Sequence, residues 1–120
     1  TEGDFTTPGG YAQAISLLEN PHRPTAIFAG SDLQAMGVYE AARQLGLRIP
    51  EDLSVVGFDD VQTASFLGPA LTTVKQPLQD MARASVRMLV EALTTDDVLQ
   101  PHVIMPTSLV VRNSTQQLNQ

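Results

Sequence analysis

The chain contains no cysteine among its 120 residues. Disulfides, thiolate metal sites and cysteine nucleophiles are therefore excluded, and thiol usage does not distinguish an oxidising from a reducing compartment. No apolar run approaches the roughly 20 residues that span a bilayer. The chain begins at Thr1 with neither the charged nor the apolar region of a secretory signal. We therefore expect a piece of a longer protein, without a membrane partner.

Basic residues are also scarce. The 7 Lys and Arg residues are outnumbered by 13 Asp and Glu residues, which gives a net charge of -6. There is no basic run or Arg-rich helix that would neutralise nucleic-acid phosphates, and an acidic chain is not attracted to an anionic membrane surface. We expect that this chain does not bind DNA by itself.

The familiar enzyme motifs are missing. The sequence has no G-x-G-x-x-G, no P-loop and no G-x-S-x-G elbow. His22 and His102 each follow a proline, and neither has a nucleophile at a recognisable spacing. No third carboxylate accompanies Asp59 and Asp60 to complete a site for a hard metal ion. We expect no catalytic residue, no metal and no cofactor.

Short apolar runs alternate with helical patterns. The runs cover residues 25–29, 53–58 and 71–75, and a helical pattern over 33–45 ends at Gly46. Continuous apolar runs are typical of parallel strands covered on both faces, and the crossover between two such strands is right-handed. The length and the 42% hydrophobic content allow one ordinary core. The pattern predicts an α/β fold.

Two helices have wide apolar faces. The helix over 33–45 is apolar on more than one side, which suggests a second buried contact such as a partner subunit. The helix that Pro77 opens carries one broad apolar stripe, so we expect it to be mostly buried.

Polar side chains follow the apolar runs. Ser31 and Asp32 follow the first, Asp59 the second and Gln76 the third. Ligands of parallel sheets bind outside the carboxyl ends of the strands, and an amide there suits sugar hydroxyls or a purine edge. The alternatives are structural, because Ser31 and Asp32 fit a helix cap and Gln76 fits a hinge. Asp59 with its neighbour Asp60 also fits a solvated turn or a Mg²⁺ site.

Residues 24–32, 46–60, 69–77 and 109–115 together resemble the carboxyl-terminal half of the effector-binding domain of the lactose/galactose-repressor (LacI/GalR) family of bacterial transcription regulators. The resemblance implies a three-layer parallel-sheet lobe of the periplasmic-binding-protein-like type I fold, here truncated. Residues 1–75 would form the carboxyl-terminal lobe. Residues 76–102 would be a hinge and a helix that packs on the amino-terminal lobe, 103–112 a returning strand and 113–120 a frayed tail.

The same resemblance implies roles for single residues. Asp59 matches the family's ligand-binding aspartate and Gln76 matches a cleft residue, so both are expected to bind the effector. Ser31 stands where the family usually has a ligand-contacting Asn, and its shorter hydroxyl lacks the paired donor and acceptor of an amide. Asp32 matches the helix-opening aspartate, to which we assign a helix-cap and structural role.

Met36, Tyr39 and Leu67 fall where relatives form a homodimer. The resemblance implies a cytoplasmic regulator that binds a sugar-like effector in a cleft between lobes and contacts operator DNA only through a headpiece absent from this chain. The alternative is the carboxyl-terminal lobe of a periplasmic sugar-binding transport protein, and an enzyme is a distant third. A helix-turn-helix upstream would favour the regulator, and a signal peptide would favour transport.

Overall fold

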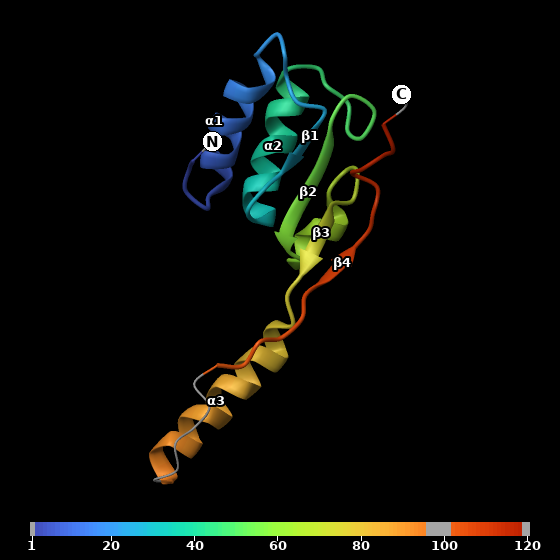
Figure 1. Ribbon diagram of the computed structural model, residues 1–120. Coiled ribbons are helices and arrows are strands. Elements are labelled where there is room, and N and C mark those ends of the chain that lie inside the picture. Colours follow the sequence, from blue (N-terminus) through green and yellow to red (C-terminus); the bar gives the residue numbers. More distant parts are fainter. Residues whose placement is uncertain (1, 96–101, 119–120) are drawn as a thin grey trace.

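Helices and strands alternate along most of the chain in the computed structural model, which describes residues 2–95 and 102–118 (Figure 1). The elements in order are α1 (Thr7–Leu18), β1 (Ala26–Phe28), α2 (Asp32–Gln44), β2 (Ser54–Asp59), the 3-10 helix η1 (Gln62–Phe66), β3 (Thr72–Lys75), α3 (Leu78–Thr94) and β4 (Ser108–Val110).

The four strands form one sheet in the order β1-β2-β3-β4. The first two pairings are parallel, as the sequence predicted, whereas β4 returns antiparallel to β3. Within the expected returning strand 103–112, only Ser108–Val110 pairs with the sheet. Asp59 is in register with Lys75, so Gln76 follows at the same edge of the sheet where β2 ends.

Helices α1 and α2 pack closely on one face of the sheet (Figure 1). Two glycines permit their contact. A Cβ added to Gly37 would lie 2.2 Å from the carbonyl oxygen of Thr7, and one added to Gly10 would lie 2.4 Å from that of Gln34. One apolar side of α2 therefore faces α1 and another faces the sheet. The excess of apolar residues on α2 does not require a partner subunit to explain it.

The described residues form two layers of the three that we predicted. The buried core lies between the sheet and the layer of α1 and α2. On the strand β1, Phe28 is 65% exposed, so the expectation that this run is covered on both faces is wrong. The physical reason is that the described part of the chain supplies helices to one face of the sheet only.

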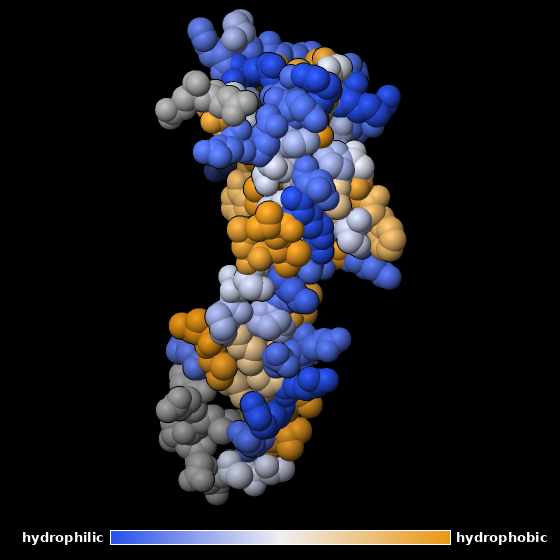
Figure 2. Space-filling model, turned by 90° about the vertical axis from the view of Figure 1, so that its right-hand side faces the viewer, coloured by the Kyte–Doolittle hydropathy of each residue, from blue (hydrophilic) through white to orange (hydrophobic). Residues whose placement is uncertain are grey.

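Helix α3 points away from the sheet and gives the molecule its 61 Å length (Figure 1). Ala84 is its one buried residue, and Leu93 is 78% exposed, so the prediction of a mostly buried helix is wrong for this structure. Hydrophobic side chains are visible on the surface of this part of the molecule (Figure 2). The helical pattern indicated a face to be covered, but nothing in the described chain covers most of it.

None of the helices in the described residues is long and apolar enough to cross a membrane.

The end of the chain is tied to the sheet rather than frayed, as far as residue 116. Ser114 is fully buried. Its hydroxyl accepts a hydrogen bond from the Thr72 amide at 2.8 Å and donates one to the Val55 carbonyl at 2.6 Å. The Val55 amide in turn donates to the Ser114 carbonyl at 2.8 Å. The predicted frayed tail is therefore wrong for residues 113–116, whereas Gln117 and Leu118 are exposed. Residues 119–120 and 96–101 lie outside the described residues.

We expect Gly37→Ala to destabilise the chain by about 1–3 kcal/mol, because the new methyl group would meet the backbone of α1 on the opposite helix. Chemical denaturation monitored by circular dichroism measures the change. Ser16→Ala, at an exposed position of α1, is the matched control and should stay within about 0.5 kcal/mol of wild type. Equal stability of the two variants would contradict the close packing of α1 against α2.

Ser114→Ala should cost about 1–3 kcal/mol, because it leaves a buried amide and a buried carbonyl without a partner. The control is Ser65→Ala, which removes an exposed hydroxyl that donates to the Gln62 carbonyl. If both variants unfold at the same denaturant concentration as wild type, the tail is not anchored as described.

Candidate ligand-binding site

Asp59 and Gln76 meet at the edge where β2 and β3 end. Asp59 is the last residue of β2 and Gln76 directly follows β3. The side-chain Nε2 of Gln76 donates to Oδ1 of Asp59 at 2.7 Å, and the contact is partly buried. Two of the three ligand-binding residues predicted from the sequence are thus side by side.

An open groove of about 490 Å³ runs from this pair towards the start of α3. Asp59 offers carboxylate acceptors, while the amide of Gln76 both donates and accepts. This combination can bind a molecule with several hydroxyl groups, because each hydroxyl donates once and accepts as well. The residues that line the groove are Asp59, Asp60, Lys75, Gln76, Pro77, Leu78, Gln79 and Asp80.

Ser31, the third predicted ligand residue, does not line the groove, although it follows a strand parallel to β2. It is only 6% exposed. Its backbone is extended at the N-cap of α2, and its hydroxyl accepts a hydrogen bond from the Gln34 amide at 3.2 Å. The structure therefore gives Ser31 the capping role that the sequence left as its alternative, which also means that Asp32 is not the helix cap.

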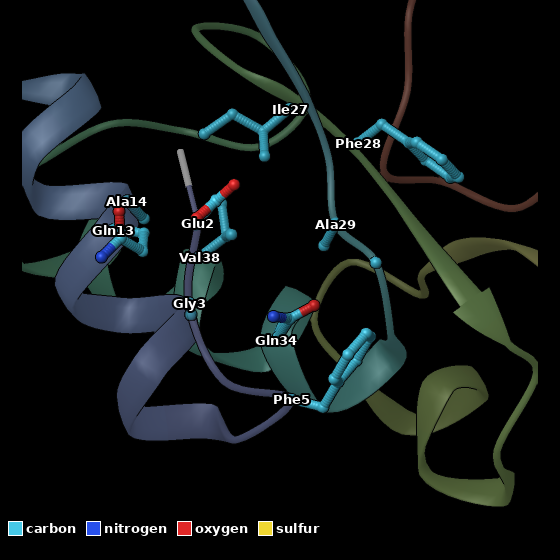
Figure 3. Close-up of a pocket in the computed structure, with 12 residues that line it drawn as sticks. Glu2, Gly3, Phe5, Gln13, Ala14, Ile27, Phe28, Ala29, Gln34 and Val38 are labelled. Atoms are coloured by element: carbon cyan, nitrogen blue, oxygen red, sulfur yellow. The ribbon is translucent and has the colours of Figure 1, made fainter.

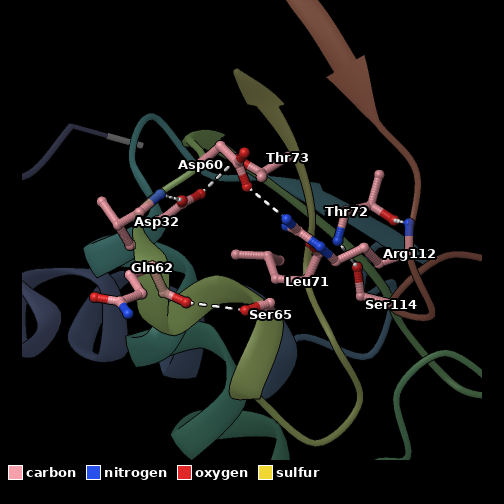
Figure 4. Close-up of polar contacts among 10 residues, drawn as sticks. Asp32, Asp60, Gln62, Ser65, Leu71, Thr72, Thr73, Arg112 and Ser114 are labelled. Atoms are coloured by element: carbon pink, nitrogen blue, oxygen red, sulfur yellow. Dashed lines mark hydrogen bonds and ion pairs between the residues drawn. The ribbon is translucent and has the colours of Figure 1, made fainter. Parts of the chain in front are cut away.

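Asp32 is the first residue of α2, and its carboxylate is fully buried. It accepts hydrogen bonds from the Val61 amide at 2.8 Å and from the Thr73 hydroxyl at 2.6 Å (Figure 4). Gly57 makes room for it, since a Cβ at that position would lie 2.2 Å from Oδ1 of Asp32. This carboxylate joins α2 to β3 and to the segment after β2.

Sequence reasoning missed an ion pair beside the groove. Nη2 of Arg112 lies 2.6 Å from Oδ1 of Asp60, and the two side chains are 19% and 13% exposed (Figure 4). Nη1 of the same guanidinium donates to the Leu71 carbonyl at 2.8 Å. The sequence offers a weak signal for this pair, because the charged side chain of Arg112 directly follows the apolar extended run 109–111.

A second groove, of about 450 Å³, lies between the segment before α1, the edge strand β1 and the helices (Figure 3). Ile27 and Ala29 line it from the strand, and the ring of Phe5 borders it near Gly30. Glu2, Gln13 and Gln34 line it along with the apolar side chains, and none of the predicted ligand residues is part of it. Within residues 2–95 and 102–118, no group of three or more His, Asp or Glu side chains is placed to hold a metal ion.

The residues predicted for a dimer interface are half-buried within the chain. Tyr39 and Leu67 pack against the core, and Met36 lies on the same helix as Tyr39. The Tyr39 hydroxyl donates to the Pro69 carbonyl at 2.9 Å, and burial raises the pKa of Tyr39 to about 12. Their role between subunits stays a prediction.

Comparison with known proteins places this chain in a family. The model of the periplasmic binding protein-like domain matches residues 1–115. A curated relative, an uncharacterized HTH-type transcriptional regulator of Streptomyces limosus, is 48% identical over 113 residues, which are 94% of this chain and 32% of the relative. The chain thus spans about a third of the length of the curated relatives it matches.

Solved structures that resemble this chain are also transcriptional regulators. A LacI family transcriptional regulator from Enterococcus faecalis with bound ribose superimposes with a TM-score of 0.91 at 30% identity, over 98% of this chain and 43% of that one. The lac repressor dimer bound to operator and an anti-inducer gives a TM-score of 0.88 at 35% identity, over 95% and 40% of the two chains. The chain therefore belongs to the periplasmic-binding-protein-like domain family, and within it to the LacI-type transcriptional regulators.

Proposed function

We propose that this chain is the effector-sensing lobe of a LacI-type transcriptional regulator and that it binds a small sugar-like molecule through Asp59 and Gln76. The observation that carries the proposal is the 2.7 Å contact between these side chains at the carboxyl ends of two parallel strands. That edge is where ligands of open α/β sheets bind. The bound ribose of the Enterococcus faecalis neighbour supports a sugar as the ligand class.

The charges of the groove favour an uncharged ligand. The carboxylate of Asp59 and one lysine, Lys75, face it, while the charges of Asp60 and Asp80 are paired with Arg112 and Arg83. With these pairs formed, the groove has no excess of charge of either sign. A neutral polyol donates its hydroxyl protons to Asp59 and exchanges hydrogen bonds with Gln76.

In the full-length regulator, the effector would lie between this lobe and an amino-terminal lobe and would change the balance of open and closed forms. Gln76 suits that task because it lies between the sheet and α3, which points away from the lobe. An effector shifts such a balance only by its difference in affinity for the two forms. A cytoplasmic homodimer would pass the change to operator DNA through headpieces outside this chain, without catalysis, metal or cofactor.

Asp59→Asn should weaken sugar binding by the full-length regulator by about tenfold or more, because a hydrogen bond to a charged group contributes about 1.5–3 kcal/mol. A thermal-shift screen of pentoses, hexoses and disaccharides, with ribose first, identifies the sugar. Calorimetry then measures its dissociation constant.

The matched control is Asp52→Asn, whose carboxylate forms an exposed ion pair with Arg48 away from the groove. Its affinity should equal that of wild type. Equal affinity of wild type and Asp59→Asn for the identified sugar would refute the assignment of Asp59.

Met36→Asp and Leu67→Asp should each convert the full-length dimer to a monomer, because a charge buried at an apolar interface is left unpaired. Analytical ultracentrifugation measures the assembly state. Leu33→Asp, at an exposed position of the same helix as Met36, is the control and should leave the dimer intact. A dimer that persists in both test variants rules out this interface.

A further inference from the structure

The segment from Asp59 to Val61 has an unusual backbone. Asp59 and Asp60 both have positive φ angles, 119° and 56°, and neither is glycine. Such conformations are uncommon for residues with side chains and persist only where the surroundings enforce them. The direction of the Asp59 carboxylate therefore depends on what holds the residues after it.

Two side chains hold this segment from opposite sides. The buried carboxylate of Asp32 accepts the hydrogen bond of the Val61 amide. On the other side, the guanidinium of Arg112 pairs with Asp60 at 2.6 Å (Figure 4). Asp60 lines the ligand groove but Arg112 does not, so the direct contact of Arg112 with the groove's lining is through Asp60.

Arg112 is itself fixed to the sheet at two further points. Its backbone amide donates to the Thr72 hydroxyl at 2.9 Å, and Nη1 donates to the Leu71 carbonyl at 2.8 Å. The planar guanidinium thus holds Leu71 and Asp60 in one fixed geometry. A lysine ammonium is a point charge without this fork, so it cannot reproduce both contacts in the same orientation.

We propose that Arg112 is a positioning residue that sets the strained conformation of Asp59 and Asp60 and thereby aims the Asp59 carboxylate at Gln76 and the ligand. The inference rests on the proposed function, because it assigns Asp59 to the ligand. Arg112 follows β4, the strand that comes after α3 and pairs with β3. Arg112 therefore connects the segment with Asp59 and Asp60 to the part of the chain that follows α3.

The test compares Arg112→Lys with Arg48→Lys in the full-length regulator. Arg48 is a matched control, since it also pairs with an aspartate, Asp52 at 2.8 Å, but in an exposed position that lies outside the groove. Two quantities are measured, namely hydrogen exchange of the Val61 amide without ligand and the dissociation constant for ribose, or for the sugar that the screen identifies.

In Arg112→Lys we expect exchange of the Val61 amide to become at least about tenfold faster, while amides of α1 and α2 keep their wild-type rates. Sugar affinity should fall about tenfold, as expected when the ligand's charged partner is misaligned. Arg48→Lys should change neither quantity. Asp60→Asn, which keeps the shape but removes the paired charge, should shift both quantities in the same direction as Arg112→Lys.

Unchanged exchange at Val61, or unchanged sugar affinity with faster exchange, would overturn the positioning role. Faster exchange throughout the chain would overturn it as well, because it would show a general loss of stability. If the wild-type regulator binds no sugar of the screen, the proposed function fails. The local exchange rate at Val61 then still decides whether Arg112 sets this segment.

Discussion

The buried carboxylate of Asp32 is the contact on which the arrangement of the lobe depends. It lies at the start of α2 and accepts hydrogen bonds from the Val61 amide and the Thr73 hydroxyl, so one side chain joins a helix, a strand and the segment between two strands. Burying a carboxylate without hydrogen-bond donors would cost folding free energy, and losing either donor would leave part of that cost without compensation. The backbone of Gly57 leaves the space in which this carboxylate sits.

The site follows from this constraint. With Val61 held by Asp32, the preceding residues turn sharply at the end of β2, and the carboxylate of Asp59 comes within hydrogen-bond distance of Gln76. Arg112 supports the same turn from the side of the returning chain. Residues from four parts of the sequence thus shape one edge of the sheet. The proposed sugar site lies at this edge.

The pairing of Asp59 with Gln76 was predictable, because parallel strands bring their carboxyl ends to the same edge and both residues directly follow apolar runs. The contacts of Asp32 were not, since its partners lie 29 and 41 residues away and a local pattern contains no such information. Ser114 in a polar tail gave no sign of its burial. The apolar stripe of α3 indicated a surface to be covered, and only the resemblance to the LacI/GalR family implied that an amino-terminal lobe would cover it.

The most direct test of the account is a crystal structure of the full-length regulator with the sugar identified by screening. We predict hydroxyl groups of the sugar within hydrogen-bond distance of the Asp59 carboxylate and the Gln76 amide, with Arg112 still paired to Asp60. A sugar bound instead in the second groove, beside Phe5 and Ile27 and away from Asp59, would contradict the central claim.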